Sequence, residues 1–386
     1  MKPTSPKTLY IYLDERCNQN CVFCVAYERG KSRFGSMSTN DAKKTIKNFM
    51  DSGGGTIAFS GGEPTIRDDL AEIIGYAEKF DNLQAISIIT NGIRLSDKNY
   101  LEKLVKADKR NKISFSFSLH SHKKEISELL TASKRSFEKT MSGIENVIES
   151  GKNASVYQVI TSKNYRDLPE FCYFLNRKYP EIKWVVFAYP FPQGRALLND
   201  WIYVRISSLR PYLIKSLRFL EGKNYVVKVA NCGQLPLCAL PGFEEKVIDP
   251  RFFTQENVIG MAGKNDFQDF EYNTDEWANH NKGKNKECKK CLFNKICQGL
   301  WKKYIDLFNF DGIQTVTKNN FKGNKIVSSL KTKKDVDEII SKLNVNKLNF
   351  LKLSDYNSKL FNQLIKTVKK KKLLLIIRFK GKNLYP

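Results

Sequence analysis

Over the first 190 residues, short runs of β-branched and aromatic residues alternate with longer segments whose apolar positions recur at helical spacing. The apolar runs are predicted as strands at 8–13, 56–60, 85–90, 112–119, 154–160 and 182–188. The segments between them are predicted as helices at 39–51, 68–80, 96–107, 136–150 and 167–178. Strands that alternate with helices predict βα units around a parallel sheet. Six strands are fewer than the eight of a closed barrel, so the predicted fold class is α/β, a partial (β/α)6 TIM-like barrel.

Polar or glycine-rich residues end or follow all six predicted strands. In chain order they include Cys17, Cys21 and Cys24; Gly61, Gly62 and Glu63; Asn91; Ser118; Asn164; and Gly194. Parallel α/β folds carry their chemistry at the carboxyl ends of the strands. We therefore expect these residues to converge on one face of the barrel and to form a site.

The first of these segments puts three thiols, Cys17, Cys21 and Cys24, within eight residues and lacks a fourth. Zinc sites and disulfides favour four-fold or even sets, and no histidine lies nearby, so half of a zinc knuckle is the weaker interpretation. A [4Fe–4S] cluster has four irons, and three cysteine ligands leave one iron open for a small molecule. The glycine pair after the second strand lets backbone approach such a molecule, and Glu63 supplies an acceptor for an ammonium group.

These motifs resemble those of the radical S-adenosylmethionine (radical SAM) superfamily. The shared features, which span residues 8–310, are CxxxCxxC with Phe23 before the last cysteine, GGEP at 61–64, TNG at 90–92, SFSLHS at 116–121 and a P-x-GRA-like segment at 192–196. The resemblance implies that the open iron chelates the amino and carboxylate groups of SAM. One electron from the reduced cluster then cleaves SAM to methionine and a 5′-deoxyadenosyl radical, which abstracts hydrogen from a substrate. An electron donor such as flavodoxin or ferredoxin is implied as a partner.

The resemblance also implies roles for individual residues. Gly61, Gly62 and Glu63 are expected to hold the methionyl amine of SAM. The further candidate cofactor contacts are Phe23, Asn91, Ser118 for the carboxylate or ribose, Asn164, and Gly194 with its loop against the adenine.

A second cysteine set lies at Cys288-x2-Cys291-x5-Cys297, with Cys232 and Cys238 upstream. The CxxCx5C spacing resembles the C-terminal auxiliary-cluster motif of radical SAM proteins in its twitch or SPASM forms. A full SPASM domain needs seven cysteines for two clusters, whereas this region has five, so the resemblance implies one auxiliary [4Fe–4S] cluster. Its expected fourth ligand is Cys238, with Cys232 as the alternate, and a four-cysteine zinc site is the competing interpretation.

The formal charge of +25 is concentrated toward the C-terminus, where residues 321–386 hold 17 Lys or Arg against 4 Asp or Glu. Within this tail, 335–343 and 357–368 are predicted as amphipathic helices and 373–379 as a strand, which makes it a basic α/β extension. The lysine run 369–372 is either solvated or a contact for an acidic partner. The predicted domains are 1–220 for the barrel core, 221–312 for the auxiliary-cluster domain and 313–386 for the extension.

The sequence contains no secretory signal and no 18-residue apolar run, so we expect a cytoplasmic protein without a membrane partner. Nine cysteines in that reducing compartment are expected to be thiols or metal ligands. The favoured function is radical SAM modification of a peptide or protein side chain. The first alternative is the same chemistry on a small metabolite or cofactor precursor. The second is a non-catalytic, metal-stabilised nucleic-acid-binding protein that uses the basic tail.

Overall fold

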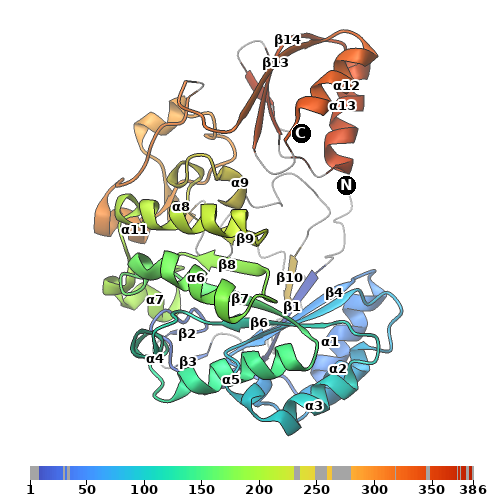
Figure 1. Cartoon of the computed structure of the whole chain (residues 1–386). Coiled ribbons are helices and arrows are strands. Elements are labelled where there is room, and N and C mark those ends of the chain that lie inside the picture. Colours follow the sequence, from blue (N-terminus) through green and yellow to red (C-terminus); the bar gives the residue numbers. More distant parts are fainter. Residues whose placement is uncertain are drawn as a thin grey trace. The chain divides into compact units, whose positions relative to one another are not determined.

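The computed structural model describes most of the chain (Figure 1). The described residues are 8–28, 31–32, 35–229, 235–247, 259–262, 280–317, 319–344, 348–371, 373, 375–379 and 382–384. The chain forms two compact units, Met1–Gln234 with Glu256–Asn281 and Leu235–Gln255 with Lys282–Pro386. Within the described ranges, no helix combines the length and apolar character that crossing a membrane requires.

An eight-stranded parallel sheet is the centre of the first unit. Its strand order is β10-β1-β4-β5-β6-β7-β8-β9. The six predicted strands are confirmed as β1 Thr8–Asp14, β4 Thr56–Gly61, β5 Ala85–Thr90, β6 Ile113–Ser118, β7 Asn153–Val159 and β8 Trp184–Ala188. Two strands that the sequence pattern does not assign to this sheet, β9 Val226–Val229 and β10 Ile259–Ala262, extend it at its edges. The chain is therefore an α/β protein built on a partial barrel, as predicted.

Helices pack along one side of this sheet, where α1, α2, α3 and α5 lie together (Figure 1). The predicted helices are confirmed as α1 Thr39–Asp51, α2 Leu70–Ala77, α3 Lys98–Ala107, α5 Ser136–Glu149 and α6 Leu168–Lys178. Further helices of the first unit are α4 Lys124–Thr131, α7 Gly194–Leu198 and α8 Ile206–Gly222. The start of α1 shows why these segments are helical, because the Ser38 side chain accepts a hydrogen bond from the backbone N–H of Asp41. Its buried residues include Ala42, Ile46 and Phe49, which form one apolar stripe.

The strands alternate apolar and polar positions, and this alternation separates the two faces of the sheet. In β6, Ile113, Phe115 and Phe117 are buried, whereas the serines between them are partly exposed. A parallel sheet covered on both faces has nearly continuous apolar strands, so the alternation indicates that helices cover only one face. The other face carries partly exposed hydroxyl groups from Tyr10, Tyr12, Ser60, Ser87, Ser114, Ser116, Ser118, Ser155 and Tyr157.

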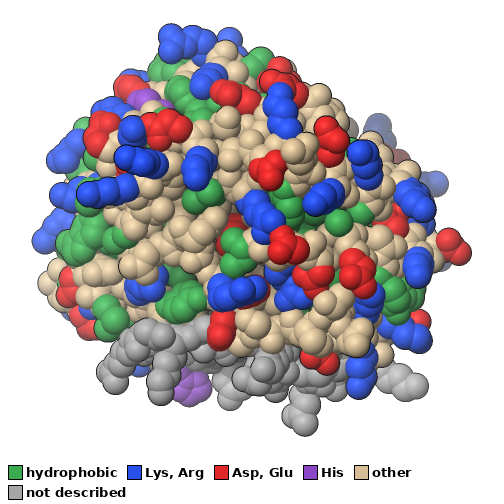
Figure 2. Space-filling view, turned by 90° about the horizontal axis from the view of Figure 1, so that it is seen from below, with side chains coloured by type: hydrophobic (Ala, Val, Ile, Leu, Met, Phe, Trp, Pro, Cys, Tyr) green, Lys and Arg blue, Asp and Glu red, His purple; other side chains and the backbone are tan. Residues whose placement is uncertain are grey.

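The helical surface of the first unit carries mixed charge. Figure 2 shows Lys and Arg side chains interspersed with Asp and Glu on this face. Among the ion pairs of this unit, Lys98 and Glu149 are 2.8 Å apart and Arg110 and Glu78 are 3.0 Å apart. Both side chains of the Lys98–Glu149 pair are exposed, and exposed pairs contribute about 0–1 kcal/mol each. Mixed charge here agrees with the positive excess that the sequence places in the C-terminal extension.

The second unit contains the second cysteine set in a segment of short elements. These elements are α9 Glu244–Val247, the strand pair β11 Lys282–Gly283 and β12 Leu300–Trp301, and α11 Lys302–Phe308. The C-terminal extension follows in the same unit. The domain boundaries expected after residues 220 and 312 stay predictions.

The C-terminal extension is a small α/β fold. Its strands β13 Asn324–Leu330, β14 Asn349–Tyr356 and β15 Leu375–Phe379 are parallel, and β16 Lys382–Leu384 is antiparallel to β15. The helices α12 Lys333–Lys342 and α13 Ser358–Lys370 connect the parallel strands. They share one core with the sheet, which includes Val336, Leu351, Leu353, Leu364 and Ile377. The two helices and the strand predicted for this tail are confirmed, and β13, β14 and β16 are additional.

Candidate active site

The three-cysteine loop follows β1, at the carboxyl end of the sheet. Cys17, Cys21 and Cys24 are free thiols of intermediate exposure. The backbone N–H groups of Asn20 and Val22 donate to the carbonyl oxygens of the last two residues of α4, at 2.9 and 3.0 Å. Hydrogen bonds to α4 therefore hold this loop, which has no regular secondary structure of its own.

The GGE segment after β4, residues 61–63, is bonded directly to the start of the cysteine loop. The N–H of Gly62 donates to the carbonyl oxygen of Asp14 at 2.7 Å, and the N–H of Glu63 donates to that of Arg16 at 2.9 Å. A Cβ at Gly61, where φ is +136°, would lie 2.5 Å from the Asp14 carbonyl oxygen, and one at Gly62 would collide with that of Arg16. The glycine pair is therefore required by close approach of two protein backbones.

Gly62→Ala is expected to lower the free energy of unfolding by about 1–3 kcal/mol, because the new methyl group meets backbone that cannot move aside. Gly75→Ala is the matched control. Gly75 lies inside α2 with nothing near the position of an added Cβ, and alanine is favoured over glycine in a helix by about 1 kcal/mol. Thermal unfolding of wild type and both variants measures the difference. Equal melting temperatures for Gly62→Ala and wild type would contradict this explanation.

Glu63 links the GGE segment to the turn after β5. Its buried carboxylate accepts hydrogen bonds at Oε1 from the Thr65 N–H (3.0 Å), the Thr65 hydroxyl (2.7 Å) and the Thr90 hydroxyl (2.7 Å). Oε2 accepts the Asn91 N–H at 2.7 Å. Burial raises the pKa of Glu63, and the hydrogen bonds from Asn91, Thr65 and Thr90 oppose that rise. A carboxylate offers about four acceptor positions over two oxygens, so Oε2, which accepts the Asn91 N–H, can accept a further hydrogen bond, and the ammonium contact stays a prediction.

Asn91 connects this carboxylate to the first cysteine. Its side-chain Nδ2 donates to Asn18 Oδ1 at 2.6 Å and lies 3.9 Å from Cys17 Sγ. The Gln19 N–H also donates to Cys17 Sγ, at 3.4 Å. Burial raises the pKa of the Cys17 thiol to about 11, so binding of a cationic cofactor must displace its proton. Burial also raises the pKa of Cys21, and the positive charge of Arg195 opposes that rise.

Phe23 and Ser118 lie where their motifs predict. The Phe23 ring is buried and packs edge-on against the His120 ring, with centroids 4.5 Å apart. Burial lowers the pKa of His120 to about 3, so this ring is neutral near pH 7. Ser118 ends β6 on the hydroxyl-rich face of the sheet.

Asn164 is hydrogen-bonded to neighbouring protein groups through both atoms of its side-chain amide. Its Nδ2 donates to the carbonyl oxygens of His120 and Val159, each at 2.8 Å. Its Oδ1 accepts from the N–H of Thr161 at 2.6 Å and from the Thr161 hydroxyl at 3.3 Å. The side chain therefore ties the segment after β6 to the end of β7, and its predicted contact with SAM stays a prediction.

Gly194 packs against the cysteine loop. It adopts φ of +55°, and a Cβ there would lie 2.5 Å from the carbonyl oxygen of Cys24 and 2.6 Å from that of Tyr27. The next residue, Arg195, donates its N–H to the Cys24 carbonyl oxygen at 2.8 Å. Contact with this loop accounts for the glycine, and the predicted contact with adenine stays a prediction.

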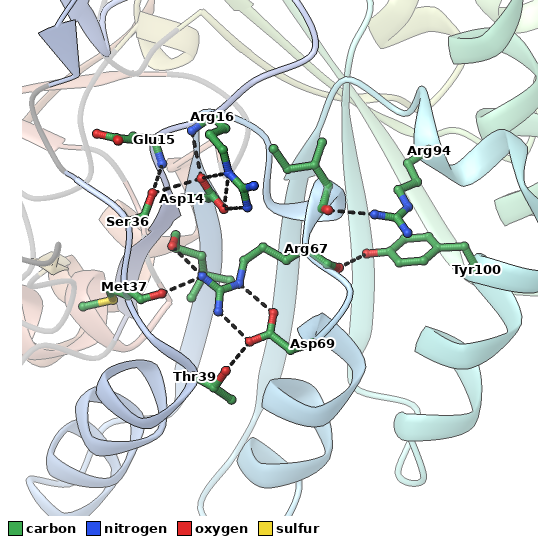
Figure 3. A network of polar contacts seen from close by, with 12 residues as sticks. Asp14, Glu15, Arg16, Ser36, Met37, Thr39, Arg67, Asp69, Arg94 and Tyr100 are labelled. Atoms are coloured by element: carbon green, nitrogen blue, oxygen red, sulfur yellow. Dashed lines mark hydrogen bonds and ion pairs between the residues drawn. The ribbon is translucent and has the colours of Figure 1, made fainter.

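A buried polar network that sequence reasoning missed surrounds this junction (Figure 3). Arg67 donates from Nη1 to the carbonyl oxygens of Leu13 (3.0 Å) and Met37 (2.6 Å), and it pairs with Asp69 at 2.5 Å. Asp14 is buried and accepts hydrogen bonds from the Arg16 guanidinium, which lower its pKa although burial opposes the shift. The only signal in the sequence is that these charged residues directly flank the CxxxCxxC and GGEP motifs.

The second cysteine set surrounds a pocket in the second unit. Cys238, Cys288, Cys291 and Cys297 all line it, together with Pro236, Gly283, Lys284, Phe293, Asn294, Gly299, Leu300, Phe310, Ile313, Gln314 and Thr315. Burial raises the pKa of Cys238 to about 12, and the three other cysteines add to that rise. The structure thus brings the four predicted ligands together, whereas Cys232 lies outside the described residues. No set of three or more His, Cys, Asp or Glu side chains in the described ranges is arranged to hold one metal ion.

Comparison with known proteins agrees with this site. Residues 11–175 match the Radical SAM superfamily. The Fe-coproporphyrin III synthase of Methanosarcina barkeri is 30% identical over 189 residues, which are 49% of this chain and 45% of that protein. The probable GTP 3′,8-cyclase of Methanothermobacter thermautotrophicus is 32% identical over 172 residues, which are 43% of this chain and 53% of that protein. The chain spans about half the length of these curated relatives.

The fold comparison extends over both units. The structure of native anSMEcpe with bound AdoMet matches 94% of this chain and 99% of that chain, with a TM-score of 0.55 at 17% identity. At this identity the likeness shows the fold alone. The cysteine loop, the GGE segment bonded to it and the sequence match define a radical SAM domain. This domain, residues 11–175, is the part of the chain that matches the Radical SAM superfamily.

Proposed function

We propose that this protein reductively cleaves SAM and uses the resulting 5′-deoxyadenosyl radical to abstract hydrogen from a substrate. The observation that carries the proposal is the pair of backbone hydrogen bonds that joins the GGE segment to the start of the cysteine loop. Because Gly62 and Glu63 donate their N–H groups to residues 14 and 16, the thiols and the amine-binding segment are fixed next to each other. A [4Fe–4S] cluster held by Cys17, Cys21 and Cys24 would supply the electron and an open iron for SAM.

The surrounding residues divide into binding and positioning groups. Gly61, Gly62 and Glu63 hold the methionyl amine, and Ser118 contacts the carboxylate or ribose. Asn91 directs its side-chain N–H toward Cys17 Sγ and orients that ligand. The other positioning residues are Phe23, which packs on His120, Asn164, which fixes the end of β7, and Gly194, which supports the cysteine loop.

We also propose that Cys238, Cys288, Cys291 and Cys297 hold one auxiliary [4Fe–4S] cluster. All four line one pocket. A tetrahedral zinc site needs four sulfurs around a single ion, whereas the cysteines of a cluster each bind a different iron and stand further apart. Metal analysis of the purified protein distinguishes this cluster from the competing four-cysteine zinc site.

We infer a peptide or protein side chain as the substrate. This inference is supported by the fold, because a structure of anSMEcpe with AdoMet and the Kp18Cys peptide matches 95% of this chain with a TM-score of 0.55. A small cofactor precursor is the second candidate, supported by the relatives named Fe-coproporphyrin III synthase and GTP 3′,8-cyclase. The non-catalytic nucleic-acid-binding alternative does not explain why the GGE segment is hydrogen-bonded to the cysteine loop.

Anaerobic incubation of the reduced protein with SAM and candidate substrates distinguishes these classes. The candidates are peptides encoded next to this gene, and GTP and coproporphyrin compounds as small molecules. We expect an encoded peptide to raise 5′-deoxyadenosine release and to change mass in high-resolution mass spectrometry. Stimulation and modification of a small molecule, with every peptide unchanged, would contradict the peptide proposal and support the second candidate.

A further inference from the structure

A row of lysines lies along the exposed face of α13 in the C-terminal extension. The row, called here the lysine stripe, consists of the exposed residues Lys359, Lys366, Lys369 and Lys370. Spacings of three, four and seven residues put these side chains on one side of the helix, whereas Leu364 and Val368 on the other side are buried. At a rise of about 1.5 Å per residue, the stripe extends over about 17 Å. The last residue of the lysine run predicted at 369–372 lies outside the described residues.

The lysine stripe has no acidic counterpart on its own helix. The sequence of α13 contains no Asp or Glu, and the described residues form no ion pair with the stripe. On α12, by contrast, Lys342 pairs with Glu338. Like charges three and four residues apart repel each other, so the stripe opposes formation of the helix that carries it. The helix dipole does not account for the stripe either, because Lys359 lies in the first turn, where the dipole disfavours a cation.

The acidic residues of the extension lie near the beginning of α13 rather than beside its later turns. Residues 321–386 contain four of them, which are Asp335, Asp337, Glu338 and Asp355. The first three belong to the first two turns of α12, and Asp355 precedes α13 and pairs with Lys331 at 3.8 Å. Both helices connect parallel strands and therefore run in the same direction. The turns that carry Lys366, Lys369 and Lys370 are thus beside the end of α12, where the charged side chain is Lys342.

The surface of the extension favours a nucleic acid duplex over an acidic peptide or protein. Protein partners gain most of their affinity from aromatic or apolar anchors. Within the described residues, none of the large hydrophobic side chains that are exposed belongs to the extension. The rings of Tyr356 and Phe361 pack against each other and against the core, which leaves no aromatic platform for unpaired bases. A duplex needs neither feature, because lysines bind its phosphates through charge.

We propose that α13 docks on double-stranded DNA, where the lysine stripe contacts the phosphates that border the major groove. The B-form major groove is about 12 Å wide and admits an α-helix, whereas the major groove of an RNA duplex is too narrow for side chains to read. Asn362 and Gln363 are exposed between Lys359 and Lys366, and their amides can hydrogen-bond to base edges. This proposal goes beyond the SAM chemistry proposed above and does not depend on it.

Fluorescence anisotropy with a labelled DNA duplex tests the proposal on the full chain. The stripe variant combines Lys359→Gln, Lys366→Gln, Lys369→Gln and Lys370→Gln, and a second variant changes the same four lysines to Arg. The matched control combines Lys44→Gln, Lys103→Gln, Lys109→Gln and Lys139→Gln, which removes the same charge from the first unit. These four lysines are exposed and form no ion pair in the described structure. Unlabelled RNA duplex and polyglutamate serve as competitors.

We expect wild type to bind the DNA duplex and to lose about 100-fold in affinity between about 50 and 200 mM salt, as contacts to four phosphates predict. The stripe variant should bind about tenfold or more weakly at the lower salt concentration and lose most of the salt dependence. Lys366→Gln alone should reduce the slope of log affinity against log salt by about 1. The Arg variant and the first-unit control should match wild type, and both competitors should displace DNA poorly.

Thermal unfolding separates lost binding from lost folding. The stripe variant should melt no lower than wild type, because it removes repulsion between neighbouring lysines. If it does unfold, the salt slope of Lys366→Gln decides, and a slope equal to that of wild type would overturn the proposal. Equal weakening by the first-unit control would also overturn it, since net charge would then explain the binding. Stronger competition by RNA or polyglutamate than by unlabelled DNA would assign the stripe to that partner, and absence of DNA binding at low salt would exclude the site.

Discussion

Simultaneous replacement of Cys17, Cys21 and Cys24 by Ala is expected to halve the iron content of anaerobically reconstituted protein. Wild type should bind about eight irons and eight sulfides per chain from two [4Fe–4S] clusters, and the variant about four. The reason is that the three thiols lie on one loop of the first unit, whereas the second set lies in the other unit. Colorimetric iron and sulfide assays give both numbers.

Cys172→Ala is the matched control for this variant. Cys172 is a fully buried thiol on α6 that belongs to neither cysteine set, and its pKa is raised by burial to about 12. Its loss should leave iron and sulfide at the wild-type values. An unchanged iron content in the three-cysteine variant would contradict the assignment of these residues as cluster ligands.

Cys238→Ala is expected to remove or destabilise the other cluster and to leave SAM cleavage without substrate measurable. Substrate turnover should fall much further than this uncoupled cleavage. If Cys238, Cys288, Cys291 and Cys297 all bind, the auxiliary cluster has no open iron and cannot chelate substrate. Its remaining roles are electron transfer and structural support, and an oxidised product would favour electron transfer because the substrate radical must lose an electron. Iron content and product formation, measured on the same preparation, test this.

Cys232→Ala is the control for the upstream ligand and should retain both clusters. Loss of iron in Cys232→Ala together with its retention in Cys238→Ala would show that the wrong upstream cysteine is assigned. Retention in both variants would indicate zinc or a ligand of another kind. Metal analysis separates these last two outcomes.

The sequence predicts the sheet well because its strands carry strong local signals. Runs such as AISIIT at 85–90 and ISFSFS at 113–118 combine β-branched or aromatic residues with sharp ends. The edge strand β10 has no such signal, since IGMA is four residues long and contains glycine. Its pairing with β1 is a long-range contact between residues about 250 positions apart, which no local pattern specifies.

The candidate cluster ligands can be picked out from the sequence, whereas the contacts of the residues around them cannot. Spacing alone marks Cys17, Cys21 and Cys24, because few chemistries use three thiols so close together. The hydrogen bonds of Asn164 depend on where its four partners lie after folding, and these partners come from the ends of two strands. Likewise, the close approach of Gly194 to the carbonyl oxygen of Cys24 joins residues 170 positions apart, which no local pattern specifies. Tertiary contacts therefore determine the surroundings of both residues.

The central claim is that the cysteine loop and the GGE segment form one site for reductive SAM cleavage. Its most direct test is the amount of 5′-deoxyadenosine released when reconstituted, dithionite-reduced protein is incubated with SAM and analysed by liquid chromatography and mass spectrometry. We expect release by wild type and Cys172→Ala, and none above background by the variant that lacks Cys17, Cys21 and Cys24. Continued release by that three-cysteine variant, or none by fully iron-loaded wild type, would contradict the claim.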